Sequence, residues 1–108
     1  MNKGKIIKSS ETYSKIINIG FSLKNKYFSI FYQKSDTNNK YGITIPKKIG
    51  KANVRNKLKR QIKNIIMTNE INIPNNYNYV IIIKEASLEL KYNEMAKELL
   101  NLLKKVSN

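Results

Sequence analysis

Residues 50–63 read GKANVRNKLKRQIK, and this stretch contains both arginines of the chain and no acidic residue. The asymmetry extends to both sides, since residues 37–69 include nine Lys or Arg and no Asp or Glu. About a third of the chain therefore carries most of its net charge of +14. A surface of this kind is expected to bind a polyanion.

The same stretch predicts a helix from residue 52 to about residue 67, because apolar and basic residues recur at spacings of three and four. At about 100° per residue, one arc of this helix carries Val54, Leu58, Ile62, Ile65 and Ile66, and the adjoining arc carries Arg55, Asn56, Lys59, Arg60 and Lys63. The first arc can pack on a core, and the second can contact phosphates. The alternative is a solvated face laced with salt bridges, but such a face normally mixes charges of both signs.

Composition limits the function further. The 108 residues are 41% hydrophobic, which is enough apolar material for one core and one domain. The chain has no Cys and no His, which excludes disulfides, Cys-based zinc sites and the commonest catalytic dyads. We therefore expect no catalytic residue, no metal site and no small-molecule substrate. No apolar run of 18 residues and no signal peptide are seen, so we expect a cytoplasmic protein without a membrane partner.

The N-terminal half is expected to hold one helix and two strands. Ser9, Ser10 and Glu11 offer helix-capping groups, and Gly20 is expected to end the helix that follows them. Residues 27–33 and 40–46 have the alternation of strands, and the polar residues 35–39 between them indicate a turn. These two strands are predicted to form a hairpin.

The C-terminal half is expected to hold a loop, a strand and a helix. Residues 71–78 contain Pro74 and are predicted to be a loop, whereas residues 79–83 are apolar on both faces. Burial on both faces predicts a central strand. From about residue 91, a closing helix is predicted from the spacing of Tyr92, Met95, Leu99, Leu102, Leu103 and Val106.

The segment YGITIPKKIG at residues 41–50 is followed by Ala52 and the core RNKLKR at residues 55–60. This combination resembles a known family, the protein subunit of bacterial ribonuclease P. The order of the other elements also matches, so the resemblance covers roughly residues 5 to 106, and residues 1–108 are expected to form a single domain of this family.

The resemblance implies an α+β fold of order αβββαβα, a two-layer sandwich like the second domain of ribosomal protein S5. Its four-stranded sheet would contain a left-handed βαβ crossover, in which the basic helix joins two parallel central strands. General rules would not predict this hand, because right-handed crossovers are strongly favoured.

The resemblance also implies a function. Proteins of this family bind the catalytic RNA subunit through the basic helix and the preceding loop, and they hold the 5′ leader of precursor tRNA in a cleft beside the sheet. The RNA subunit and its Mg²⁺ ions remove the leader in tRNA 5′ maturation. The RNA contacts implied here are Lys47, Lys48, Lys51, Arg55, Asn56, Lys57, Lys59, Arg60 and Lys63. The implied leader contacts are Tyr13, Phe31, Lys59 and Lys63.

Four positions depart from the family pattern. Lys57 stands where the family usually has Arg, Pro46 where it has Ser, Glu85 in a segment that is usually basic, and Ile17 where a second aromatic residue is usual. Lys keeps the charge of Arg but loses its bidentate geometry.

Several alternatives remain open from the sequence. Each lysine could simply be solvated, Asn56 could bond its own backbone, and Tyr13 and Phe31 could be ordinary core residues. A ribosomal-type RNA-binding module would share the charge but not the spacing of residues 42–60. A protein-only nuclease would need clustered acids for metal binding, and a membrane-surface helix would need bulky apolar anchors.

Overall fold

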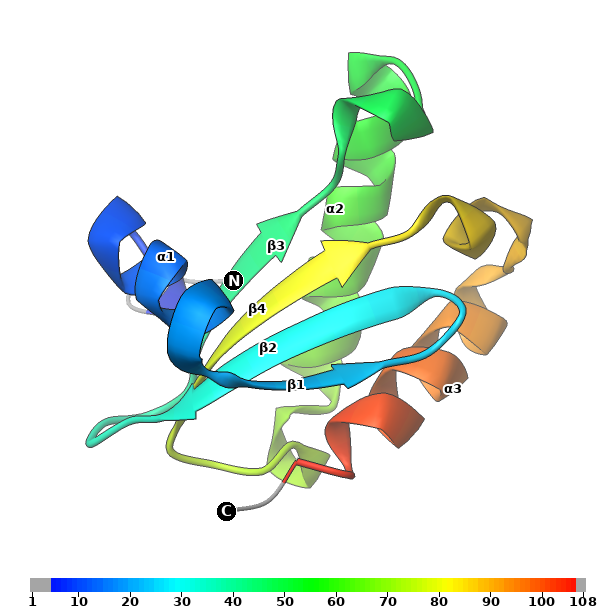
Figure 1. Ribbon diagram of the computed structural model, residues 1–108. Helices are drawn as coiled ribbons and strands as arrows, with labels where there is room; N and C mark the ends of the chain where they lie inside the picture. Colours follow the sequence, from blue (N-terminus) through cyan, green and yellow to red (C-terminus); the bar gives the residue numbers. More distant parts are fainter. Residues whose placement is uncertain (1–4, 107–108) are drawn as a thin grey trace.

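The computed structural model describes residues 5–106 (Figure 1), so the ends of the expected 1–108 domain lie outside them. The regular elements within this range follow the order αβββαβα: α1 (Ser10–Ile19), β1 (Phe21–Lys24), β2 (Phe28–Lys34), β3 (Lys40–Thr44), α2 (Ala52–Thr68), β4 (Tyr77–Ile83) and α3 (Tyr92–Leu103). Three short 3₁₀ helices connect them: η2 (Lys47–Ile49), η3 (Glu70–Asn72) and η4 (Glu85–Glu89).

The four strands form one sheet in the order β1-β2-β4-β3. The predicted hairpin of residues 27–33 with 40–46 is wrong, because β4 lies between β2 and β3. β4 is apolar on both faces and is buried most fully when it has a strand on each side. β2 forms its hairpin with β1 instead, a short strand that the sequence did not reveal. β4 also begins at Tyr77, two residues before the predicted start.

β3 and β4 are parallel and are joined by α2. In Figure 1 they run in the same direction, β4 lies to the right of β3, and α2 passes behind the sheet. The crossover is therefore left-handed, as the resemblance implied. Of these two parallel strands, however, only β4 is central. β3 is last in the sheet order, and beyond it the chain adds an isolated bridge between Ile6 and Tyr41.

The two faces of the sheet are covered differently. Tyr41 belongs to the main core, together with residues of α2 and α3 such as Ile62 and Leu99. Gly42 comes next along β3 and thus faces the other side, where its Cα lies against Tyr13 of α1. The sheet and the α2–α3 layer form the two main layers, and α1 lies across part of the opposite face (Figure 1).

α1 begins and ends where the sequence predicts. Ser9 is its N-cap, and the Ser9 hydroxyl accepts a hydrogen bond from the Thr12 N–H at 3.2 Å. Gly20 ends the helix with an ordinary φ of −75°, so a left-handed conformation is not the reason for glycine here. A Cβ at Gly20 would lie 2.4 Å from the Ile16 carbonyl oxygen and 2.7 Å from that of Tyr32. Lack of space therefore requires glycine.

α2 spans Ala52–Thr68, as predicted, and four of the five residues on its apolar arc are buried: Leu58, Ile62, Ile65 and Ile66. The exception is Val54, which is 37% exposed. Figure 1 shows the reason, because the first turns of α2 extend past the ends of β3 and β4. Tyr92, which was also expected to pack inward, is 38% exposed, and its hydroxyl group donates to Asn64 of α2.

Candidate nucleic-acid interface

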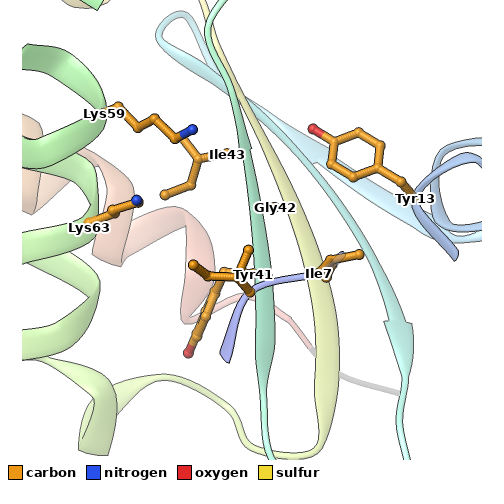
Figure 2. Close-up of a pocket in the computed structure, with 8 residues that line it drawn as sticks. Ile7, Tyr13, Tyr41, Gly42, Ile43, Lys59 and Lys63 are labelled. Carbon is orange, nitrogen blue, oxygen red and sulfur yellow. The ribbon is translucent and has the colours of Figure 1, made fainter. Parts of the chain in front are cut away.

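The cations of α2 are distributed over three directions around the helix axis. Lys59 and Lys63 point toward the β3 edge of the sheet, as Figure 2 shows. Arg60 lies about 100° further around the helix than Lys59 and is exposed to solvent. Lys57 lies on the opposite flank, facing η4 and α3. The exposed side of α2 is therefore positive from one flank to the other.

The N-terminal end of α2 adds to this positive surface. Lys47 and Lys48 of η2 and the N-cap residue Lys51 are all exposed. The buried side chain of Ile49 anchors η2 to the core. The first turn of α2 has no side-chain cap and no acidic residue, so its free N–H groups leave the positive end of the helix dipole uncompensated.

Arg55 is half-buried, and it differs from the other cations of α2 because it has an internal partner. Its Nε donates a hydrogen bond to the Gly50 carbonyl oxygen at 3.1 Å. This bond ties the first turn of α2 to the preceding loop, so Arg55 positions Lys51 as well as carrying charge. Asn56 is exposed.

None of the cations in η2 or α2 forms an ion pair within residues 5–106. The ion pairs found there join Lys5 to Glu70 and Lys26 to Glu89, the latter at 4.0 Å. The salt-bridged face considered from the sequence is thus absent from the described part of the chain. Self-repulsion of unpaired cations disfavours the compact state, and a bound polyanion would relieve it.

Tyr13 of α1 lies on the β3 edge from the other side of the sheet (Figure 2). A Cβ at Gly42 would lie only 2.5 Å from Cε2 of Tyr13, so glycine is needed for this approach. The Tyr13 hydroxyl oxygen is buried and has no hydrogen-bond partner in the described structure. Burial raises the pKa of Tyr13, so the phenol remains a neutral donor at physiological pH.

A single hollow wraps around this edge and brings three of the four predicted leader contacts together. It is lined by Tyr13, Lys59 and Lys63, together with Gly42 and Ile43 of β3 (Figure 2). Phe31 does not line it. Phe31 pairs with Val80, which in turn pairs with Gly42, so Phe31 lies on the same sheet face two strands away, about 10 Å from Gly42.

The importance of Gly42 was missed from the sequence, although a signal was present. An isolated glycine inside a strand often marks a close approach of another group to the backbone. Here that group is the Tyr13 ring, and Gly42 allows the ring to reach the edge of the sheet.

A buried polar network fixes the start of β3. The Asn39 side chain donates to the Pro74 carbonyl oxygen at 2.8 Å and accepts from the Tyr77 N–H at 2.9 Å. The Tyr79 hydroxyl group also donates to Pro74, at 2.6 Å, and the Tyr41 and Tyr79 rings stack with centroids 5.5 Å apart. Burial raises the pKa of Tyr41 to about 12. This network holds β3 and β4 in register and so positions the edge that Tyr13 and Lys63 flank.

The described part of the chain lacks both a metal-binding cluster and a membrane-spanning helix. No three His, Cys, Asp or Glu side chains come together there as a metal site would require. No helix there is long and apolar enough to span a membrane.

The family model for ribonuclease P matches residues 1–107. The chain belongs to the ribonuclease P protein family. Ribonuclease P protein components similar to it include one from Mycoplasma mycoides subsp. mycoides, 38% identical over 98% of this chain and 99% of that protein. Another, from Carboxydothermus hydrogenoformans, is 33% identical over 96% of this chain and 92% of that protein.

Solved structures of the family have the same fold. The ribonuclease P protein from Thermotoga maritima is 31% identical, covers 94% of this chain and 97% of its own, and superposes with a TM-score of 0.88. The Staphylococcus aureus protein is 25% identical, covers 98% and 100%, and also gives 0.88. The family assignment makes the chain a protein component of an endoribonuclease complex of tRNA processing.

Proposed function

We propose that this protein binds the RNA subunit of ribonuclease P through η2 and α2 and holds the 5′ leader of precursor tRNA against the β3 edge. The observation that carries the proposal is the set of unpaired cations on α2. Their side chains diverge toward the β3 edge, the solvent and η4, so one helix can contact two RNA segments at once.

For the RNA subunit, the contacts would come from the exposed cations of η2 and the outer face of α2, with Lys51, Arg55 and Asn56 at the start of the helix. Lys and Arg that neutralise phosphates release counterions, which favours binding. The Arg60 guanidinium can bind a phosphate through two N–H groups, whereas Lys57 acts as a point charge.

For the leader, the contacts would come from Lys59, Lys63, Tyr13 and Phe31. A single strand is typically held by a positive groove together with aromatic faces on which unpaired bases stack. The hollow at the β3 edge combines both features, and Phe31 lies further along the same sheet face. The hydroxyl group of Tyr13 lacks an internal partner and would gain one from a base or a phosphate.

The chemistry would belong to the RNA subunit, which would bind the Mg²⁺ ions that activate the attacking water. The side chains of this protein would neutralise phosphates and orient the leader, and none would transfer a proton. We place this activity in the cytoplasm.

The test is reconstitution with a bacterial ribonuclease P RNA at low Mg²⁺ concentration, with precursor tRNA as substrate. The protein should restore cleavage at the leader junction, and rigorously RNA-free protein should cleave nothing. Cleavage by the protein alone would contradict the assignment of chemistry to the RNA. Equal binding to this RNA and to unrelated RNAs, without restored cleavage, would instead indicate a general RNA-binding module.

A further inference from the structure

A second hollow lies on the flank of α2 that faces away from β3, between α2, η4 and α3. Its walls are about equally polar and apolar, and Val54, Leu58, Leu88, Leu90 and Met95 supply the apolar part. Its volume is about 240 Å³. An engineered apolar cavity of about 150 Å³ holds benzene, so this hollow is large enough for a planar ring of one or two cycles.

One polar group in the wall has no partner. Ser87 of η4 is fully buried, and its Oγ makes no hydrogen bond within the described residues. A buried hydroxyl group without a partner costs free energy and calls for an explanation. A ring that carries hydrogen-bonding groups on its edge would provide the missing partner, and the amide of Gln61 lines the same hollow.

The charge beside the opening indicates which kind of ring would fit. Lys57 of α2 lines the hollow and belongs to the cationic surface that continues onto Arg60. η4 carries Glu85 and Glu89, but neither lines the hollow, and the carboxylate of Glu89 lies 4.0 Å from Lys26, near the β1–β2 turn. Val54 and Leu88 are 37% and 45% exposed. A slot with both apolar and polar walls therefore opens directly beside a cation.

We propose that this hollow accepts an unpaired nucleobase of the RNA subunit, with the adjoining phosphate on Lys57. The inference rests on the proposed function and extends it, because it places a base contact on the flank opposite the leader. Unpaired RNA bases are commonly bound in this way, with an apolar contact to the ring and hydrogen bonds to its edge. The Ser87 hydroxyl and Gln61 amide would supply those hydrogen bonds.

The absence of cysteine from the chain allows a direct test. A Leu88→Cys variant carrying an azidophenacyl group would be bound to a bacterial ribonuclease P RNA, irradiated and mapped by reverse transcription. The matched control is Ile71→Cys, because Ile71 is 94% exposed and lies in η3, beyond the other end of α2. We expect strong crosslinks from position 88 to one or a few unpaired nucleotides. Crosslinks as weak and dispersed as those from position 71 would overturn the inference.

A second variant tests the hydroxyl group without relying on crosslinking. Because Ser87 Oγ has no internal partner, Ser87→Ala should melt at the same or a higher temperature. Its affinity for the RNA should nevertheless fall about two- to ten-fold, the value of one hydrogen bond. Lower thermal stability with unchanged affinity would show an internal role and overturn the inference. If the unmodified protein does not bind the RNA, the proposed function fails first, and the inference falls with it.

Discussion

Replacing Gly42 by alanine would test whether Tyr13 is held at the β3 edge by lack of space. The three heavy atoms nearest to an added Cβ all belong to the Tyr13 ring, at 2.5, 3.1 and 3.5 Å. Ordinary contacts between carbon atoms begin near 3.5 Å, so the ring must move by about 1 Å. The backbone itself would accept alanine, because Gly42 does not have a left-handed φ.

The expected loss of stability is small because two effects oppose each other. Overpacking typically costs about 1–3 kcal/mol, whereas Gly→Ala at a compatible φ gains about 0.4–1 kcal/mol by restricting the unfolded chain. We expect a net loss of about 1 kcal/mol, measured by urea unfolding. Since the ring is displaced from the hollow, the affinity of the reconstituted enzyme for precursor tRNA should fall about ten-fold, while that for mature tRNA should not change.

The control is the same substitution in a Tyr13→Ala background. With the ring removed, the three closest contacts of the new methyl group are gone, so Gly42→Ala should become stabilising, by about 0.4–1 kcal/mol. The sign of the effect should thus reverse between the two backgrounds. If Gly42→Ala and Tyr13→Ala changed stability additively, the two residues would not be coupled, and the argument about the β3 edge would be refuted.

Three further predictions concern RNA binding and pH. The double variant Arg55→Ala and Arg60→Ala should weaken RNA binding and make the slope of log affinity against log salt shallower by about 1.5; an unchanged slope would place the RNA surface elsewhere. Phe31→Ala should weaken binding of precursor tRNA about ten-fold without affecting assembly with the RNA subunit. If instead it mainly lowers the melting temperature, Phe31 is a core residue. Because the pKa of Tyr41 is raised to about 12 in the folded state, its contribution to stability should be complete below about pH 10 and be lost as the pH rises toward 12. A melting temperature that Tyr41→Phe alters equally at pH 8 and pH 11.5 would contradict this.

The helices could be predicted well from the sequence because their signals are local. The Ser9 cap, the apolar spacing of α2 and the leucines of α3 each lie within a few turns of chain. The predicted burial of Val54 was wrong, because its exposure depends on where the strands end. The spacing of residues along α2 gives no information about that. Helical geometry placed Lys59 and Lys63 on one arc with Arg55, Asn56 and Arg60, but it did not separate them as the two that point toward the β3 edge.

The sheet could be predicted only in part because strand pairing is not local. The alternation in β2 and β3 indicated two strands but not their partners, and proximity in sequence favoured a hairpin. β1 has only four residues and is largely exposed, so it gives almost no hydrophobic pattern. The crossover hand contradicts the general rule and came from the family resemblance alone. The short distance between Gly42 and Tyr13 likewise depends on how α1 lies across the sheet.

The error about the hairpin bears directly on the candidate site. If β2 had paired with β3, β3 would have had β2 on one side and β4 on the other. Neither edge of β3 would then have been exposed. In the observed order, β4 fills the centre and β3 is left at the margin of the sheet. Only at a margin can side chains from opposite faces meet around the same strand. Tyr13 from α1 and Lys63 from α2 do so here, which explains how a helix packed behind the sheet can share a binding site with one in front.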